Sequence, residues 1–296
     1  MTKSRSALLL LVVLALPSAV AAQAAMLVFS AQLDNNWDLF LFEHGQLTRL
    51  SKTAIDERGP ALSTNRAKVA YTTSDGSLWV TDLRSRVNMK LGGAPGQYGY
   101  PAWVPNKEEL VYTLYSFSPP SEDADFYRCV LNPRQYQLFI RQTGPQDYIA
   151  FSPQGDKVAY MSSVATLLAQ SMPFVSQQLW VMSLQDGKSE PLFWGSSKNS
   201  RPAWSPDGRM LAFSSDRSGH PQIWLADFQN SGALSQLTQG PGDKTHPCWA
   251  GDGRLYFISN VSGIDEVYSM GAGTKGVRKE DVFGSRKVPT QDLSCR

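Results

Sequence analysis

Three histidines are the side chains best suited to acid–base or metal chemistry in this sequence. Histidine changes its protonation near neutral pH and is the commonest metal ligand in proteins. His44 falls in a predicted turn, His220 in a predicted loop, and His246 directly before a proline at a predicted strand. These places belong to different edges of the predicted fold, whereas a metal needs ligands that converge on one point. We therefore predict no metal site and no cofactor.

A catalytic nucleophile is equally hard to assign. The G-x-S-x-G turn of serine hydrolases does not occur in the sequence. The run Asp216-Arg217-Ser218-Gly219 brings a carboxylate, a guanidinium and a hydroxyl together, but Asp and Ser in such loops mostly accept backbone N–H groups. We interpret the run as residues that fix the conformation of a loop, and we predict no catalytic residue. The alternative is an enzyme, of the lyase or hydrolase type, that acts on a small molecule or a glycan in a central channel.

The sequence contains Cys129, Cys248 and Cys295. Their long and irregular spacing fits no zinc pattern, and an odd number leaves at least one of them unpaired within the chain. A bridge between Cys248 and Cys295 is one option, and ordinary core or loop cysteines are the favoured interpretation.

The N-terminal residues 1–24 are typical of a cleaved signal peptide. Lys3 and Arg5 precede an apolar run that Pro17 ends, and small residues follow. No cysteine lies near the cleavage region, so we expect no lipid anchor, and no later segment is apolar enough to span a membrane. The rest, 25–296, is predicted to be one exported, soluble domain. Without the signal it has 26 basic and 26 acidic residues. Its net charge is therefore near zero, which does not favour binding to the phosphates of nucleic acid.

A repeated pattern organises this domain. Each copy starts with a short apolar stretch around a proline, whose place Ile149 takes in one copy. A large residue follows, then a tight turn, and the copy closes on an aromatic residue 10 or 11 positions after the start. Repeats of roughly 45 residues with several short strands each indicate a β-propeller. The copies are anchored at Pro60, Pro101, Ile149, Pro202 and Pro247.

Each copy is predicted to form four antiparallel strands. Pairs such as Asp207-Gly208 supply the positive-φ residue that a tight hairpin between the first two strands requires. A third strand follows in each unit, marked by a short apolar run. These runs are Leu78-Trp79-Val80, Leu138-Phe139-Ile140, Leu179-Trp180-Val181, Ile223-Trp224-Leu225 and Val267-Tyr268.

The two ends of the domain predict how the ring closes. The chain enters at Met26 with a second strand, so its first unit has no innermost strand of its own. Residues 288–294 offer a spare strand, with Val288 and Pro289 in the places of the residue before the anchor and of the anchor itself. One C-terminal strand would then complete a blade begun by three N-terminal strands, which removes exposed sheet edges. The fold class is all-β, a six-bladed β-propeller.

The strongest copy resembles the signature repeat of TolB-type propellers. It reads Pro202-Ala203-Trp204-Ser205-Pro206-Asp207-Gly208 and continues through Phe213 to Gly219 and on to Ile223-Trp224. The same repeat occurs in propellers attached to prolyl-oligopeptidase-type hydrolases and in some sugar lyases. The resemblance implies a periplasmic protein of the Tol–Pal envelope system, whose propeller receives the peptidoglycan-associated lipoprotein at its channel mouth. Because a strand follows the signal directly, we expect a propeller-only relative, without the separate α/β domain of TolB.

Together these features predict a non-catalytic, monomeric scaffold that binds an envelope protein or a Pal-like lipoprotein. The spacing from the second-strand to the third-strand aromatic is 27 residues in the third unit and 20 in the fourth, against 8 to 11 elsewhere. We expect docking on the face with these two insertions, and replacement of Arg201 or Tyr100 by alanine is expected to spare folding. The predicted partner-binding residues are Tyr100, Tyr148, Arg201 and His246 at the mouth and Tyr115, Phe117, Leu167, Leu168, Met172 and Phe174 in the insertions.

Overall fold

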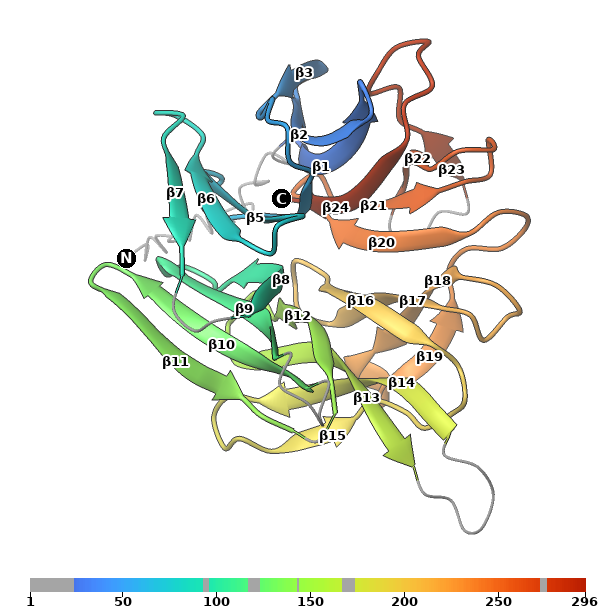
Figure 1. Ribbon diagram of the computed structural model, residues 1–296. Coiled ribbons are helices and arrows are strands. Elements are labelled where there is room, and N and C mark those ends of the chain that lie inside the picture. Colours follow the sequence, from blue (N-terminus) through green and yellow to red (C-terminus); the bar gives the residue numbers. More distant parts are fainter. Residues whose placement is uncertain (1–23, 93–95, 117–122, 143, 167–173, 272–275) are drawn as a thin grey trace, which may run out of the picture.

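The computed structural model describes residues 24–92, 96–116, 123–142, 144–166, 174–271 and 276–296. These residues form six four-stranded antiparallel sheets arranged around a common centre (Figure 1). The fold is a six-bladed β-propeller, as the sequence predicts. A short 3₁₀ turn at Phe228–Asn230 interrupts the strands, and no helix in the described part of the chain is long and apolar enough to cross a membrane.

The blades follow the chain, and each is numbered here from its innermost strand outward. Blade 1 is β24 (Thr290–Cys295), β1 (Met26–Leu33), β2 (Asn36–Glu43) and β3 (Gln46–Arg49). Blade 2 is β4 (Glu57–Leu62), β5 (Lys68–Thr73), β6 (Leu78–Asp82) and β7 (Asn88–Leu91). Blade 3 is β8 (Gln97–Trp103), β9 (Glu109–Ser116), β10 (Asp123–Leu131) and β11 (Arg134–Ile140).

The second half of the ring repeats the same order. Blade 4 is β12 (Gln146–Phe151), β13 (Lys157–Thr166), β14 (Phe174–Ser183) and β15 (Ser189–Pro191). Blade 5 is β16 (Asn199–Trp204), β17 (Met210–Ser215), β18 (Gln222–Asp227) and β19 (Ala233–Gln236). Blade 6 is β20 (Lys244–Trp249), β21 (Arg254–Ser259), β22 (Glu266–Gly271) and β23 (Val277–Lys279).

Burial explains why the centres of the second strands are apolar. Each is covered on both faces by neighbouring blades, so Tyr160, Phe213 and Phe257 at their centres have no exposed surface. Strands buried on both faces are expected to read as continuous apolar runs. The tight hairpins that precede them place a residue in the left-handed region. This residue is glycine in blades 5 and 6, with φ +72° at Gly208 and +78° at Gly253, whereas Arg66 takes the same place in blade 2 with φ +58°.

The ring closes through one C-terminal strand, as predicted, but in a different register. Leu27 pairs with Cys295 and Val28 with Ser294, and a bulge follows before Ser30 pairs with Gln291. This pairing places Leu293 where the other blades have their anchor proline. The assignment of Pro289 to that place is therefore wrong by four residues, because a longer connection precedes the last strand.

The predicted third strand of blade 3 also needs correction. Residues 138–140 lie in β11, the outermost strand, and the third strand is β10, in which Tyr127 pairs with Tyr112. Strands β9 and β10 are long, so much of the apparent insertion consists of paired strand residues and not of a loop. Periodicity alone could not tell a third strand from a fourth when both are apolar.

The Asp216–Gly219 run fixes the conformation of its loop, as predicted. Asp216 Oδ1 accepts the backbone N–H of Lys198 at 2.8 Å. The guanidinium of Arg217 lies 4.2 Å from the ring centroid of Phe193 and 4.8 Å from that of Trp224. Cation–π contacts of this kind hold the arginine against the edge of the blade.

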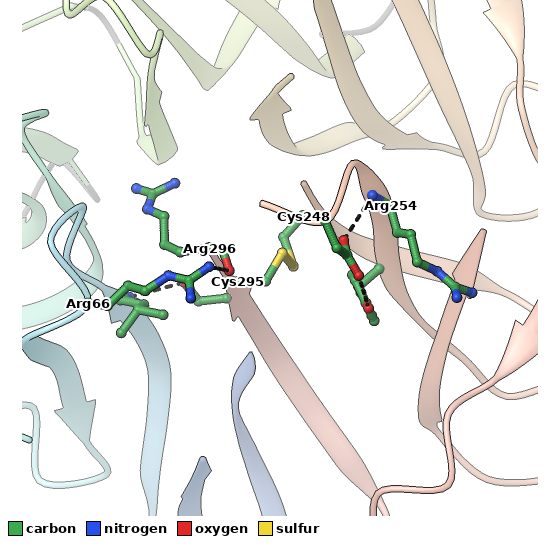
Figure 2. The surroundings of a disulfide bond; sticks show 9 residues. Arg66, Cys248, Arg254, Cys295 and Arg296 are labelled. Atoms are coloured by element: carbon green, nitrogen blue, oxygen red, sulfur yellow. Dashed lines mark hydrogen bonds between the residues drawn. A yellow bond between two sulfur atoms is a disulfide. The ribbon is translucent and has the colours of Figure 1, made fainter. Parts of the chain in front are cut away.

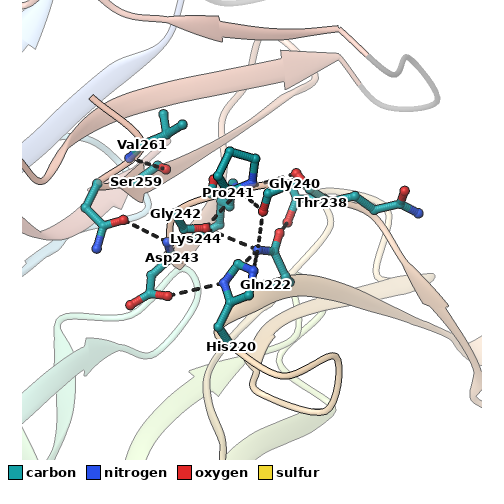
Figure 3. Close-up of polar contacts among 12 residues, drawn as sticks. His220, Gln222, Thr238, Gly240, Pro241, Gly242, Asp243, Lys244, Ser259 and Val261 are labelled. Atoms are coloured by element: carbon teal, nitrogen blue, oxygen red, sulfur yellow. Dashed lines mark hydrogen bonds and ion pairs between the residues drawn. The ribbon is translucent and has the colours of Figure 1, made fainter. Parts of the chain in front are cut away.

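A buried lysine has a comparable structural role (Figure 3). Lys244 is 5% exposed, and its ammonium donates to the carbonyl oxygens of residues 239–242 at 2.6 to 3.3 Å. The same loop is bound by Gln222, whose amide donates to Gly240 and Gly242. Because the ammonium is engaged by four acceptors, Lys244 serves as an internal cation for the loop rather than as a reactive amine.

Candidate functional site

A cavity of about 420 Å³ lies along the propeller axis. Its walls are the second halves of the innermost strands β4, β8, β12, β16, β20 and β24 and the hairpins that follow them. Concave sites with apolar walls and a few polar groups are where soluble proteins bind ligands. The cavity is therefore the candidate binding site.

Six equivalent residues surround the axis at one end of this cavity. In each innermost strand the register of pairing shifts at one residue, and that residue has a φ between +42° and +58°. Such bulges re-aim a side chain, and positive φ is uncommon outside glycine. We call this set the bulge ring; it consists of Gly59, Tyr100, Tyr148, Arg201, His246 and Asp292.

An acidic residue joins four blades within the bulge ring. Asp292 Oδ1 lies 3.1 Å from Arg201 Nη1 and 3.1 Å from His246 Nε2. Its other oxygen, Oδ2, accepts the backbone N–H of Gly59 at 3.2 Å. His246 Nδ1 also lies 2.8 Å from Thr245 Oγ1, so both ring nitrogens have partners. The carboxylate is the centre of a hydrogen-bonded network across the axis.

Two tyrosines complete the ring on the other side. The rings of Tyr100 and Tyr148 lie 4.1 Å apart between centroids, and their hydroxyl groups are hydrogen-bonded at 3.1 Å. The guanidinium of Arg201 lies 4.5 Å from the centroid of Tyr148 and 5.5 Å from that of Tyr100. Arg201 thus connects the aromatic half of the ring to the carboxylate half.

The buried setting shifts the pKa values of the ring. Burial and the nearby charge of Arg201 lower the pKa of His246 to about 4, against the opposing effect of Asp292, so the imidazole is neutral at pH 7. The pKa of Asp292 is far below its usual range, because hydrogen bonding from His246 and the charge of Arg201 outweigh burial. A neutral histidine of such low basicity is a weak general base at neutral pH.

A second carboxylate lies next to the ring. Tyr115, in β9, donates its hydroxyl to Asp147, in β12. Burial raises the pKa of Asp147 to about 6, although Tyr115, Thr113 and Arg201 all favour the ionised form. Burial and the charge of Asp147 raise the pKa of Tyr115. The phenol stays protonated and holds the carboxylate in place.

Asp147 should make stability depend on pH in an unusual direction. A carboxyl whose folded-state pKa is raised opposes folding when it is ionised, so its effect is absent below pH 4 and complete above pH 6. The advantage of Asp147→Asn over the unchanged protein should therefore grow by about 1.4 kcal/mol for each pH unit between 4 and 6. Urea unfolding at four pH values measures this difference, and Asp156→Asn, at an exposed carboxylate in a hairpin, is the matched control. A constant difference across this range would contradict the assignment.

The structure brings together the four residues predicted at the mouth, since Tyr100, Tyr148, Arg201 and His246 all belong to the bulge ring. Tyr115 lies in strand β9 and not in a loop. It contacts Asp147, which directly precedes Tyr148 of the bulge ring. Phe174 begins strand β14. The remaining predicted residues, Phe117, Leu167, Leu168 and Met172, lie outside the described residues.

Sequence reasoning missed Asp292 and Asp147. The sequence pattern favours Val288 at the sixth ring position because Pro289 resembles an anchor, whereas strand register places Asp292 there. The signal available was the match of Asp292-Leu293-Ser294-Cys295 to the spacing of Tyr100-Pro101-Ala102-Trp103. No sequence pattern marks Asp147, which gains its setting from burial and from the contact with Tyr115. The described residues contain no cluster of His, Cys, Asp or Glu arranged to hold a metal ion.

The cavity extends from the bulge ring toward the hairpins between first and second strands. Thr64, Pro105 and Pro206 in these hairpins belong to its lining. The sequence predicts docking on the opposite face, which bears the two insertions. The cavity opens among the hairpins because six of them surround one axis, which no single turn can reveal.

A disulfide also lines the cavity. Cys248 in β20 is bonded to Cys295 in β24 (Figure 2), with their Cα atoms 5.8 Å apart. The favoured interpretation of these two as ordinary cysteines is therefore wrong, because the register of β24 places Cys295 opposite blade 6. Cys129 is a buried thiol whose pKa is raised to about 11 by burial.

Comparisons with known proteins agree with this architecture. Residues 151–294 match the family model of the TolB beta propeller domain. An uncharacterized peptidase, YuxL, of Bacillus subtilis is 31% identical over 128 residues, which are 43% of this chain and 18% of the relative. A TolB homolog of Protochlamydia amoebophila is 25% identical over 201 residues, 66% of this chain and 41% of the relative. The chain thus spans less than half the length of these relatives.

The crystal structure of TolB from Acinetobacter baumannii superposes with a TM-score of 0.74 at 16% identity, over 92% of this chain and 66% of that one. This likeness concerns the fold. The sixfold repeat, the strand that closes the ring and the match over residues 151–294 define the class. The protein is a TolB-like β-propeller.

Proposed function

We propose that this chain is a non-catalytic binding scaffold that receives a protein partner of the cell envelope in its central cavity. The observation that carries the proposal is the state of the ionisable groups in the bulge ring. Asp292 is bound by Arg201, His246 and Gly59, and both nitrogens of His246 are engaged. The ring thus offers a rigid recognition surface and no free base. The TolB relatives favour an envelope partner, in a Tol–Pal-type system.

We place the protein in the periplasm, after cleavage of residues 1–24. The Cys248–Cys295 disulfide supports this placement, because disulfides persist in oxidising compartments. N-terminal sequencing of the periplasmic product tests the cleavage. A sequence that begins at Met1 would contradict it.

Site-specific crosslinking in cells tests the partner site. A photoreactive phenylalanine analogue replaces Thr64, which lines the cavity at the hairpin face, or Thr48, which is exposed on the outermost strand β3. A third position, Ser116, adjoins the connection of blade 3 on the opposite face. We expect a discrete periplasmic adduct from Thr64 and none from Thr48.

The other outcomes separate the alternatives. An adduct only from Ser116 would overturn the cavity site and favour docking on the insertion face, with Phe117, Leu167, Leu168 and Met172. Equal labelling from all three positions would mean that no specific partner occupies the cavity. Cleavage of peptide substrates by the purified protein would overturn the non-catalytic role and favour an activity like that suggested by the name of the peptidase relative.

A further inference from the structure

The outermost strand of blade 3 differs from the outermost strands of the other blades. Strand β11 (Arg134–Ile140) has seven residues, whereas β3, β7, β15, β19 and β23 have three or four. It lies on the outer rim of the ring (Figure 1), and none of the described strands pairs with its outer side. An edge strand presents a row of unpaired backbone N–H and C=O groups that another strand can bind. Blade 3 therefore has the longest free edge among the described strands.

The sequence of β11 lacks the features that normally keep an edge strand from pairing. Proteins protect such edges with short strands, lysine, proline or charged side chains. Strand β7 contains Lys90, β15 ends at Pro191 and β23 contains Lys279. Residues 135–140 of β11, by contrast, include neither a charged residue nor a proline. They do include tyrosine, phenylalanine and isoleucine, which are enriched in strands, so this edge favours the addition of a strand.

Contacts with both neighbouring blades hold β11 in place. The hydroxyl of Tyr136 accepts the backbone N–H of Gly92, which follows the last strand of blade 2, at 3.0 Å. On the other side, the ring centroid of Phe139 lies 6.1 Å from that of Phe151 in blade 4. Between these two anchored residues, Leu138 is 42% exposed. The edge is thus fixed before it meets a partner, and a fixed edge loses little conformational entropy on binding.

We propose that β11 pairs with β11 of a second copy of this chain, antiparallel and across a twofold axis. The two copies have edges of equal length, and a twofold axis brings identical edges together. In the register centred on Gln137, Tyr136 lies opposite Leu138 of the second copy, and cross-strand pairs of aromatic and aliphatic side chains stabilise a sheet. Arg134, the charged residue of the strand, lies opposite Ile140, so no like charges face each other.

The shape of the ring makes this dimer a transient one. The outermost strands on either side of β11 are short and the rim curves away from it (Figure 1), so the contact is confined to one strand of each copy. Stable complexes bury roughly 1,200–2,000 Å² in total, and a single pair of strands buries less. The dimer therefore forms and dissociates with concentration, in contrast to the sequence-based expectation of a monomer.

The cavity stays accessible in the dimer. None of the residues of β11 belongs to its described lining. Because the paired strands run antiparallel, the hairpin faces of the two copies point in opposite directions, and each cavity opens to its own side. Dimerisation at the rim is thus independent of the proposed scaffold function.

Sedimentation velocity of the purified protein tests the proposal. Between about 5 and 500 µM it should show a monomer–dimer equilibrium with a dissociation constant on the order of 100 µM, as interfaces below the standard size do. Leu138→Lys should weaken dimerisation about tenfold, because lysine on an edge strand opposes pairing. Val277→Lys is the matched control, since Val277 is 47% exposed on the outermost strand of blade 6. That change should alter the dissociation constant less than about twofold.

A pair of charge variants at the centre of the interface tests the pairing itself. Gln137 is exposed, so Gln137→Glu and Gln137→Lys should both fold. Each variant alone should dimerise about threefold to fivefold more weakly at low salt, because like charges then face each other across the axis. An equal mixture of the two should recover the dimer, since unlike charges then face each other. A change in folding at Gln137 could not produce this recovery.

Two results would overturn the proposal. One is a protein that stays monomeric at the highest concentration; capture of a different envelope protein in cells by a photoreactive analogue at Gln137 would then assign the edge to a foreign strand. The other is a dimer that Leu138→Lys and the Gln137 variants leave unchanged, which would mean that the copies meet at another surface. Crosslinking from Thr64 in the cavity does not depend on either result, so the scaffold function is tested separately.

Discussion

Replacement of both Cys248 and Cys295 by alanine should lower the free energy of unfolding by about 2–4 kcal/mol. The bond closes a loop with a sequence separation of 47 residues. For a loop of that length, the chain-entropy model gives a stabilisation of about 4 kcal/mol. The effect should be near the upper part of this range because β24 is a terminal strand, and terminal segments fray unless they are tied down. Loss of β24 would also expose the edge of β1 and open the ring.

Urea unfolding with and without a reductant measures this effect. The reductant should bring the unchanged protein down to the stability of the double variant and leave the variant unaffected. Cys129 is a thiol in both proteins, so it cancels in the comparison. A reductant that leaves the unchanged protein as stable as before would contradict the role of the bond in ring closure.

Arg201→Ala should cost about 3–5 kcal/mol, in contrast to the sequence-based expectation that folding is spared. Arg201 is the cationic partner of Asp292, which is only 10% exposed, and it also covers the rings of Tyr100 and Tyr148. Removing one member of a buried ion pair leaves the other charge without compensation. The loss should be much larger than for Arg209→Ala, which removes a guanidinium that is 62% exposed and 3.7 Å from Asp207.

A double-mutant cycle with Asp292→Asn isolates the ion pair. In the asparagine background the same Arg201→Ala change leaves no uncompensated carboxylate, so its cost should fall by more than about 1 kcal/mol. The cost that remains measures the contacts with the tyrosines. Strictly additive effects would mean that the ion pair contributes nothing to the ring.

The sequence alone was sufficient for the class of fold and for most of the ring. Copies anchored at Pro60, Pro101, Ile149, Pro202 and Pro247 recur with nearly constant spacing, and each copy dictates one blade because its hairpin and its apolar strands are specified locally. The residue before the anchor could therefore be assigned to the axis in five blades, at Gly59, Tyr100, Tyr148, Arg201 and His246.

Tertiary structure alone decided what those residues do. The register of β24 depends on pairing with β1, nearly the whole chain away, so local pattern favoured Pro289 over Leu293 and overlooked Asp292. The same long-range pairing brings Cys295 to Cys248 and Arg296 to Arg66. Repeats specify a blade through local spacing, whereas ion pairs, disulfides and pKa values across the axis arise only when six blades close into one ring.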